Sequence, residues 1–143
     1  MSRRPAFSFL EFFAGGGMAR AGLGDAWTCR FANDVDPLKA AVYRANFGDD
    51  DLALRDVWAL EAADLPAARA DLAWASSPCQ DLSLAGARAG LGGARSSAFW
   101  GFWRQIGALD AEGRAPGVVV LENVAGLLNS NGGGDLAAIG QAF

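Results

Sequence analysis

Cys79 is the residue of this chain whose neighbours best suit a nucleophile. It follows a proline in the polar stretch "ASSPCQDLSLAG", just past a short apolar run. A cysteine nucleophile usually has a histidine base beside it, and the chain contains no histidine. The chemistry of Cys79 therefore has to differ from that of a cysteine hydrolase.

Glu122, in the stretch "VVVLENV", is a candidate proton donor for the same reaction. If the strands that precede Cys79 and Glu122 pair, a thiolate and a carboxyl group lie side by side. Such a pair suits attack on an electron-poor ring. The thiolate adds to C6 of cytosine, an acid near N3 assists, and C5 becomes able to take a methyl group. Nearby arginines or a helix N-terminus would activate the thiol.

A glycine turn, Gly15 to Gly17, separates an apolar segment from a predicted helix. Glycines there permit positive φ and close approach of the backbone to a ligand. Arg20 occupies the last glycine position of a G-x-G-x-x-G fingerprint, which disfavours a nicotinamide-dependent oxidoreductase. The alternative to a binding site is a tight turn without a ligand.

Two acids, Asp34 and Asp56, end the next two predicted strands. A carboxylate at such a strand end commonly accepts hydrogen bonds from a ribose, and Asp56 would accept from an exocyclic amine. Either acid would alternatively cap the helix that follows it, and capping is the better interpretation of Asp36, which precedes Pro37. The glycine turn and the two acids together indicate a nucleoside-bearing cofactor without a required pyrophosphate, such as S-adenosylmethionine.

These residues require a scaffold that brings strand ends together. Strands are predicted over residues 7–13, 27–33, 51–57 and 117–123 and in a segment that ends near 75; helices are predicted after the glycine turn to about 24, over 37–48 and over 96–113. Strands that alternate with helices predict an α/β fold, a doubly wound, mostly parallel and Rossmann-like sheet. In such sheets ligands bind outside the carboxyl ends of the strands.

Composition limits the function classes. The chain has 143 residues, 52% of them hydrophobic, which suits one folded domain. The net charge of -4 argues against strong non-specific electrostatic binding to nucleic acid. Two cysteines without histidine leave a tetrahedral zinc site half empty, so no metal is expected, and Cys29 inside a strand is expected in the core. The sequence shows no signal peptide and no membrane span, so a cytoplasmic location is expected.

Six blocks of the sequence resemble the DNA (cytosine-5) methyltransferases. They cover most of residues 7–128 in the order and spacing of that family, and they read "FFAGGGMARAGL", "NDVD", "RDV", "SPCQDLSLAG", "GARSSAFW" and "ENVAGLL". The resemblance implies the S-adenosylmethionine-dependent methyltransferase fold, with double-stranded DNA as substrate. It also implies a restriction-modification or phage-related setting.

The resemblance assigns roles residue by residue. Cys79 becomes the nucleophile and Glu122 the acid that contacts a flipped-out cytosine. Extruding that base costs a few kcal/mol, which the protein must offset. The implied cofactor-binding residues are Phe13, Ala14, Gly15, Gly17, Asp34, Val35, Asp56, Pro78 and Ala98. Gln80 and Ser83 would belong to the loop that closes over DNA.

The chain also departs from the family pattern. Met18 stands where the first motif usually has glycine, and Val35 stands where many members carry an aromatic residue that stacks on adenine. The later motifs and the target recognition domain are absent, so residues 1–143 are expected to form a partial catalytic domain. A second subunit would be one source of the missing part. Alternative functions are a transfer-RNA cytosine-5 methyltransferase of the same family, or an inactive, truncated S-adenosylmethionine-binding module.

Overall fold

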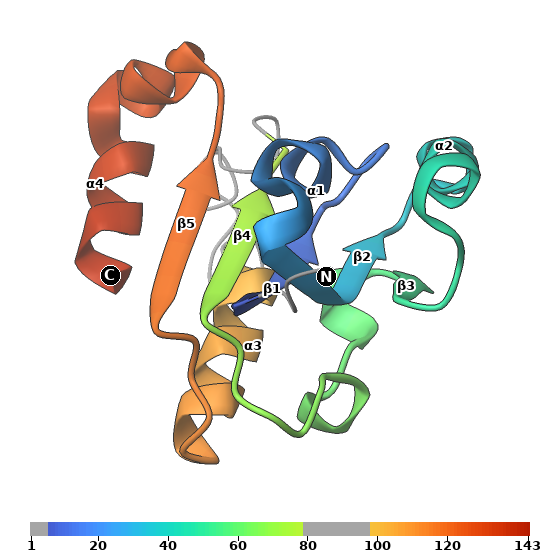
Figure 1. Ribbon diagram of the computed structural model, residues 1–143. Helices are drawn as coiled ribbons and strands as arrows, with labels where there is room; N and C mark the ends of the chain where they lie inside the picture. Colours follow the sequence, from blue (N-terminus) through green and yellow to red (C-terminus); the bar gives the residue numbers. More distant parts are fainter. Residues whose placement is uncertain (1–5, 79–97) are drawn as a thin grey trace.

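The structure is a computed structural model that describes residues 6–78 and 98–143. Its centre is a five-stranded parallel sheet with strand order β3-β2-β1-β4-β5 (Figure 1). The strands are β1 (Phe7–Phe12), β2 (Trp27–Asp34), β3 (Leu52–Leu54), β4 (Leu72–Ser76) and β5 (Val118–Glu122). The strand order reverses between β1 and β4, which is where sheets of this kind bind ligands, beyond the carboxyl ends of the strands.

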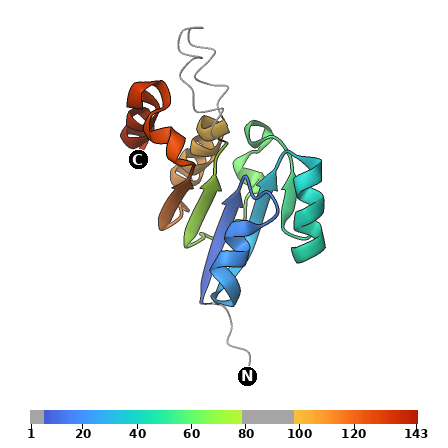
Figure 2. The same ribbon diagram turned by 90° about the horizontal axis from the view of Figure 1, so that it is seen from above.

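Helices lie on both faces of this sheet (Figure 2). The helices are α1 (Met18–Leu23), α2 (Pro37–Phe47), α3 (Ala98–Ala111) and α4 (Gly134–Ala142). In Figure 2, α1 and α2 cover one face, and α3 and α4 lie on the other. The doubly wound α/β fold predicted from the sequence is therefore confirmed.

Local sequence explains where the helices on the first face begin and end. Asp36 caps α2, because its Oδ1 accepts hydrogen bonds from the backbone N–H groups of Leu38 and Lys39. Pro37 occupies the first turn, where its missing N–H costs nothing. Gly24 ends α1 at φ 67 and Gly48 ends α2 at φ 81, conformations that favour glycine. The capping interpretation of Asp36 is confirmed.

Residues of β1 alternate between the two cores of the domain. Phe9 packs on the face of α1 and α2, together with Cys29 and Tyr43. Leu10 and Phe12 pack on the opposite face, against aromatic and aliphatic residues of α3. Both sides of β1 are buried, and four of its six residues are apolar, as expected of a central parallel strand; Ser8 and Glu11 are the polar ones.

Helix α3 presents one apolar face to the sheet. Phe99, Phe102, Ile106 and Leu109 are buried on it, which matches the helical spacing of these residues. Trp103 is partly buried, and its ring centroid lies 4.6 Å from that of Phe143 at the end of α4. This contact joins the two helices of the second face.

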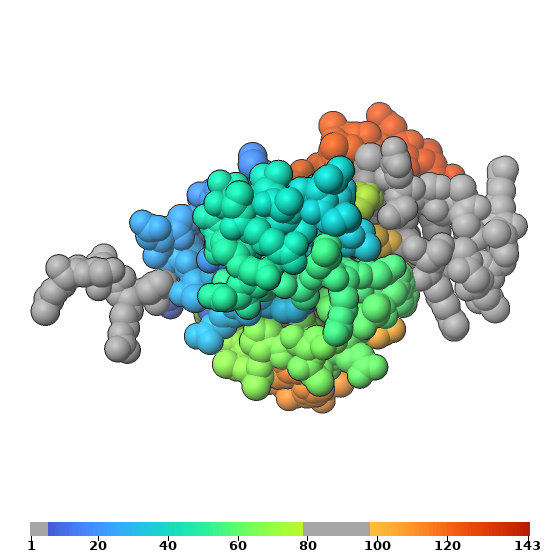
Figure 3. Space-filling model, turned by 90° about the vertical axis from the view of Figure 1, so that its right-hand side faces the viewer, coloured from blue at the N-terminus to red at the C-terminus, as the bar shows by residue number. Residues whose placement is uncertain are grey.

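The element boundaries differ from the sequence-based ones in small ways. β1 ends at Phe12 rather than Phe13, and β3 is limited to Leu52–Leu54. Two short 3-10 helices, η2 (Val57–Ala59) and η3 (Ala62–Asp64), follow β3. Figure 3 shows α2 beside the segment from β3 to η3 on this side of the molecule. In the residues described, no helix has the length and apolar character that a bilayer crossing requires.

Candidate active site

The glycine turn between β1 and α1 has a backbone that only certain residues tolerate. Gly15 has φ 55 and Gly17 has φ 87, and a Cβ on Gly17 would lie 2.3 Å from the Phe47 ring. Phe13 also has positive φ, at 55, which is rare for an aromatic residue. Met18 begins α1 and is 82% exposed, so the turn does not need glycine at that position.

Asp34 at the end of β2 ties the turn to the neighbouring strand. Its carboxylate is buried, and it accepts the Gly15 N–H on Oδ2 and the Asp36 N–H on Oδ1, both at 2.8 Å. An ionised carboxylate offers about four acceptor positions. Two therefore remain for a ligand such as the vicinal hydroxyls of a ribose.

Asp56 follows β3 and caps η2. Its Oδ1 accepts the Trp58 N–H at 2.9 Å, so the capping role weighed for this residue is present. The side chain is also in the wall of a cavity, next to Val57 and Trp58. A carboxylate that accepts one hydrogen bond from a capped N–H group still has further acceptor positions for a donor in that cavity.

A cavity of about 380 Å³ opens at the carboxyl ends of β2, β3 and β4. This volume lies within the range of small-molecule sites. Predicted site residues that line it are Phe13, Asp34, Val35, Asp56, Pro78 and Ala98. Gly15 is hydrogen-bonded to Asp34 in its wall, while Ala14 and Gly17 complete the adjoining turn. The donor and acceptor set, two carboxylates with spare acceptor positions beside apolar walls, fits a nucleoside-bearing cofactor.

Sequence reasoning missed several lining residues. These are Asn33, Lys39, Arg55, Val57, Trp58 and Ser76. Most of them adjoin a predicted acid or the proline of the "SPC" segment, so an inspection of near neighbours would have found them. Val35 is 65% exposed at the cavity, which leaves more of this wall open than an aromatic residue would.

A second hollow lies between α1 and the strands β4 and β5, and Glu122 lines it. The parallel pairing of β4 with β5 places Ser76 opposite Glu122, as the sequence-based argument required. Ser76 lines both hollows, so the Glu122 carboxyl lies one strand away from the cofactor-sized cavity. Cys79, Gln80 and Ser83 lie outside the described residues; Cys79 follows Pro78 directly in the chain.

Asn123 joins the strand end of Glu122 to the segment before Cys79. Its Nδ2 donates to the backbone oxygen of Ser77 at 2.9 Å, and its Oδ1 accepts the Val124 N–H. The "ENV" and "SPC" segments, which are far apart in the sequence, are therefore linked by a direct hydrogen bond.

Glu11 is a buried acid behind the glycine turn. It lies within β1 and is 1% exposed, and its Oε1 accepts the Arg20 N–H at 3.3 Å. Burial raises the pKa of Glu11 to about 7, against the lowering effect of hydrogen bonds from the backbone of Arg20 and Ala19. In the described part of the chain, no group of three or more histidine, cysteine or acidic residues is suited to a metal ion.

Comparison with known proteins agrees with this arrangement. The family model for C-5 cytosine-specific DNA methylases matches residues 7–143. The chain is 33% identical to the type II methyltransferase M.HpaII of Haemophilus parainfluenzae over 137 residues, which is 95% of this chain and 36% of that protein. It is 31% identical to M.BsuFI of Bacillus subtilis over 133 residues, 92% of this chain and 30% of that protein. The chain thus spans about a third of the length of these relatives.

Solved structures share the fold. The Dnmt2 methyltransferase of S. pombe has a TM-score of 0.67 at 22% identity, over 94% of this chain and 39% of that one. The Entamoeba histolytica methyltransferase EhMeth has a TM-score of 0.71 at 17% identity, over 95% of this chain and 42% of that one. Since the family model covers nearly the whole sequence, this chain belongs to the C-5 cytosine-specific DNA methylase family.

Proposed function

We propose that this chain is the cofactor-binding and catalytic part of an enzyme that methylates C5 of cytosine in DNA, with S-adenosylmethionine as methyl donor. The observation that carries the proposal is that Ser76 lines two adjoining hollows. One is the cavity lined by Asp34 and Asp56, and the other is the hollow lined by Glu122. In this arrangement, a cofactor site and an acid for the target base meet at Ser76, in the same short segment of the chain as Cys79. Membership of the DNA methylase family supports the substrate class.

The residues around the cavity have separate tasks in cofactor binding. The buried Asp34 carboxylate accepts the ribose hydroxyls on its remaining acceptor positions, and Asp56 accepts the exocyclic amine of adenine. Phe13, Val35 and Ala98 supply apolar walls, and Pro78 separates the cofactor from the target base. Ala14, Gly15 and Gly17 shape the turn that passes next to the methionine part.

The bound cofactor would supply the electrophilic methyl group. The Cys79 thiolate adds to C6 of the flipped cytosine, and Glu122 supplies a proton at N3, which makes C5 nucleophilic. Once C5 carries the methyl group, a base removes the C5 proton. The electron pair of the C5–H bond then expels the Cys79 thiolate, N3 returns its proton to Glu122, and the aromatic ring is restored. This sequence needs no histidine.

DNA recognition is assigned to residues outside these 143, either in the same protein or in a second subunit. A net charge of -4 gives this part little general affinity for a polyanion. The type II methyltransferases among the relatives favour a restriction-modification setting. They and the DNA methylase family model also favour DNA over transfer RNA as the substrate.

The covalent step is tested with duplex DNA in which 5-fluorocytosine replaces cytosine. The fluorine at C5 cannot leave as a proton does, so the adduct persists after denaturation. The protein, completed by any further residues or subunit, is mixed with this DNA and the cofactor, and the adduct is located by peptide mass spectrometry. We expect it on Cys79. An adduct that persists in Cys79→Ser would disprove the nucleophile assignment.

Two further experiments address the alternative functions, a transfer-RNA methyltransferase and an S-adenosylmethionine-binding module. The same assay with 5-fluorocytosine-substituted transfer RNA would give the adduct if the substrate were RNA. Calorimetry on the 143-residue chain should show weak or no cofactor binding. Nanomolar affinity would mean that this part completes the pocket by itself.

A further inference from the structure

Residues 55–58 line one wall of the cofactor-sized cavity. They belong to the segment from Arg55 to Leu60, which contains only one short 3-10 helix. β3 ends at Leu54, and η2 covers three residues. Val57 and Leu60 are buried. Backbone carbonyls in such a segment need hydrogen-bond donors from elsewhere, because a buried carbonyl without a partner is costly.

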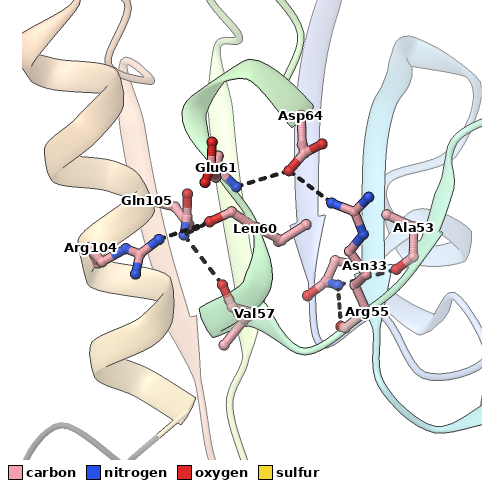
Figure 4. Close-up of polar contacts among 9 residues, drawn as sticks. All are labelled: Asn33, Ala53, Arg55, Val57, Leu60, Glu61, Asp64, Arg104 and Gln105. Atoms are coloured by element: carbon pink, nitrogen blue, oxygen red, sulfur yellow. Dashed lines mark hydrogen bonds and ion pairs between the residues drawn. The ribbon is translucent and has the colours of Figure 1, made fainter.

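Gln105 of α3 supplies donors to this segment from one side. Its side chain is 1% exposed, and Nε2 donates to the carbonyl oxygens of Val57, at 3.2 Å, and of Leu60, at 3.0 Å (Figure 4). Arg104 adds a second donor to Leu60 at 2.9 Å, and its guanidinium carbon lies 5.7 Å from the ring centroid of Trp58. The Gln105 amide therefore donates to two carbonyls of this segment, and one of them, that of Val57, belongs to a residue that lines the cavity.

Asn33 of β2 supplies donors from the other side. It is also 1% exposed, and its Nδ2 donates to the carbonyl oxygens of Ala53, at 3.1 Å, and of Arg55, at 2.8 Å (Figure 4). The backbone oxygen of Asn33 accepts the Ala14 N–H at 2.8 Å. One residue thus connects the glycine turn to the segment that carries Asp56.

The two amides hold the peptide units on both sides of Asp56. The Arg55 carbonyl precedes it and is bound by Asn33, and the Val57 carbonyl follows it and is bound by Gln105. Gln105 stands on a face of α3 whose other buried members include Phe102, Ile106 and Leu109. An apolar residue would fill that place without the desolvation cost of an amide. We therefore attribute the presence of Gln105 to the hydrogen bonds that its N–H groups donate.

We propose that the carboxamides of Asn33 and Gln105 are positioning groups that fix the direction of the Asp56 carboxylate and so set the cavity's preference for a base with an exocyclic amine. The inference rests on the proposed function, in which the cavity takes an adenine nucleoside. It adds the two residues that control this selectivity without touching the base.

The test compares two ligands that differ at the base. S-adenosylhomocysteine carries the exocyclic amine, and S-inosylhomocysteine has a carbonyl oxygen there. Dissociation constants for the chain are measured by ligand-detected NMR, which registers weak binding. We expect the parent chain to prefer the adenosyl ligand, and Gln105→Met to lose that preference by about threefold to tenfold, the range of one hydrogen bond.

Methionine conserves the volume of glutamine, so the packing of α3 is retained. Affinity for the inosyl ligand should stay unchanged, because Gln105→Met removes no contact to it. The matched control is Gln141→Met, at an exposed position of α4, which should leave both affinities unchanged. An equal loss of affinity for both ligands in Gln105→Met would indicate a merely structural role and would overturn the proposal, as would an unchanged preference.

Hydrogen exchange in the free chain separates this proposal from the proposed function. The Trp58 and Ala59 amides are hydrogen-bonded to Asp56, and exchange at these amides should accelerate about fivefold or more in Gln105→Met, with the strands unaffected. If Gln105→Met does not fold, Arg104→Met, at an exposed position, should give a smaller acceleration in the same segment. Unchanged exchange overturns the positioning role. If the parent chain binds neither ligand, the same comparison is made on the protein completed by its further residues or subunit. Failure of that completed protein to bind either ligand, with exchange accelerated, counts against the cofactor site instead.

Discussion

Replacement of Gly101 by alanine should destabilise the fold by forcing α3 away from the cavity wall. A Cβ on Gly101 would lie 2.6 Å from Cγ1 of Val57 and 3.1 Å from two atoms of the Trp58 indole. Real Cβ atoms essentially never approach to 2.6 Å, so Val57 or the helix must move. Val57 is 4% exposed, so a shift of its side chain disturbs the residues packed around it.

The magnitude follows from two opposing effects. Overpacking of a filled core costs about 1–3 kcal/mol. Alanine is favoured over glycine inside a helix by about 0.5–1 kcal/mol. The net loss in the free energy of unfolding for Gly101→Ala is therefore about 0–2.5 kcal/mol, centred on about 1 kcal/mol.

Gly107→Ala on the same helix is the matched control. Gly107 is exposed and a Cβ there meets nothing within 4 Å, so only the helix preference acts and the fold should gain about 0.5–1 kcal/mol. Urea unfolding followed by circular dichroism measures both variants, which should differ by the overpacking cost of about 1–3 kcal/mol. If Gly101→Ala were as stable as Gly107→Ala, the close contact of α3 with Val57 would be wrong.

Three further predictions concern the glycine turn and its carboxylates. Because the pKa of Glu11 is raised from 4.5 to about 7, its protonation stabilises the fold below about pH 4.5, and this contribution is lost as the pH rises through 7. Urea titrations should show Glu11→Gln gaining about 3 kcal/mol relative to the parent chain between about pH 4.5 and pH 8; a constant difference would contradict the raised pKa. Gly17→Ala combines positive φ with a clash at Phe47 and should lower the melting temperature strongly, whereas Gly22→Ala, with nothing within 4 Å of its Cβ, should not; equal melting temperatures would refute the turn geometry. Asp34→Asn leaves the N–H of Gly15 or Asp36 without its acceptor and should cost about 1–3 kcal/mol in urea unfolding at neutral pH, a loss that a freely solvated Asp34 would not show.

The sequence was sufficient for features that depend on near neighbours. The apolar run Val118–Leu121 predicted a strand, which is present at the edge of the sheet and is only partly buried. Asp36 followed by Pro37 predicted the start of α2, because capping acts over a few residues. The strand order could not be read from any one segment. The sequence-based site argument depended on pairing of the strands before Cys79 and Glu122, and the structure pairs β4 with β5, with Ser76 opposite Glu122.

Tertiary structure decided which polar residues serve the cavity. Gln105 reads in the sequence as one polar position in an aromatic helix, yet it is bonded to carbonyls 45 and 48 residues away. Trp58 was not among the predicted site residues, and it lines the cavity. Glu11 lies in the first predicted strand, and folding buries its carboxyl group and raises its pKa.

The physical reason is the range of the interactions. Turns, caps and strand burial are set by residues close along the chain, so the order of residues alone determines them. A buried amide or carboxyl acquires its role from the groups that folding brings around it. For this protein the sequence determined the strand ends and the chemistry available at them, and only the packing of α3 and β2 against the segment after β3 decided how Asp56 is held.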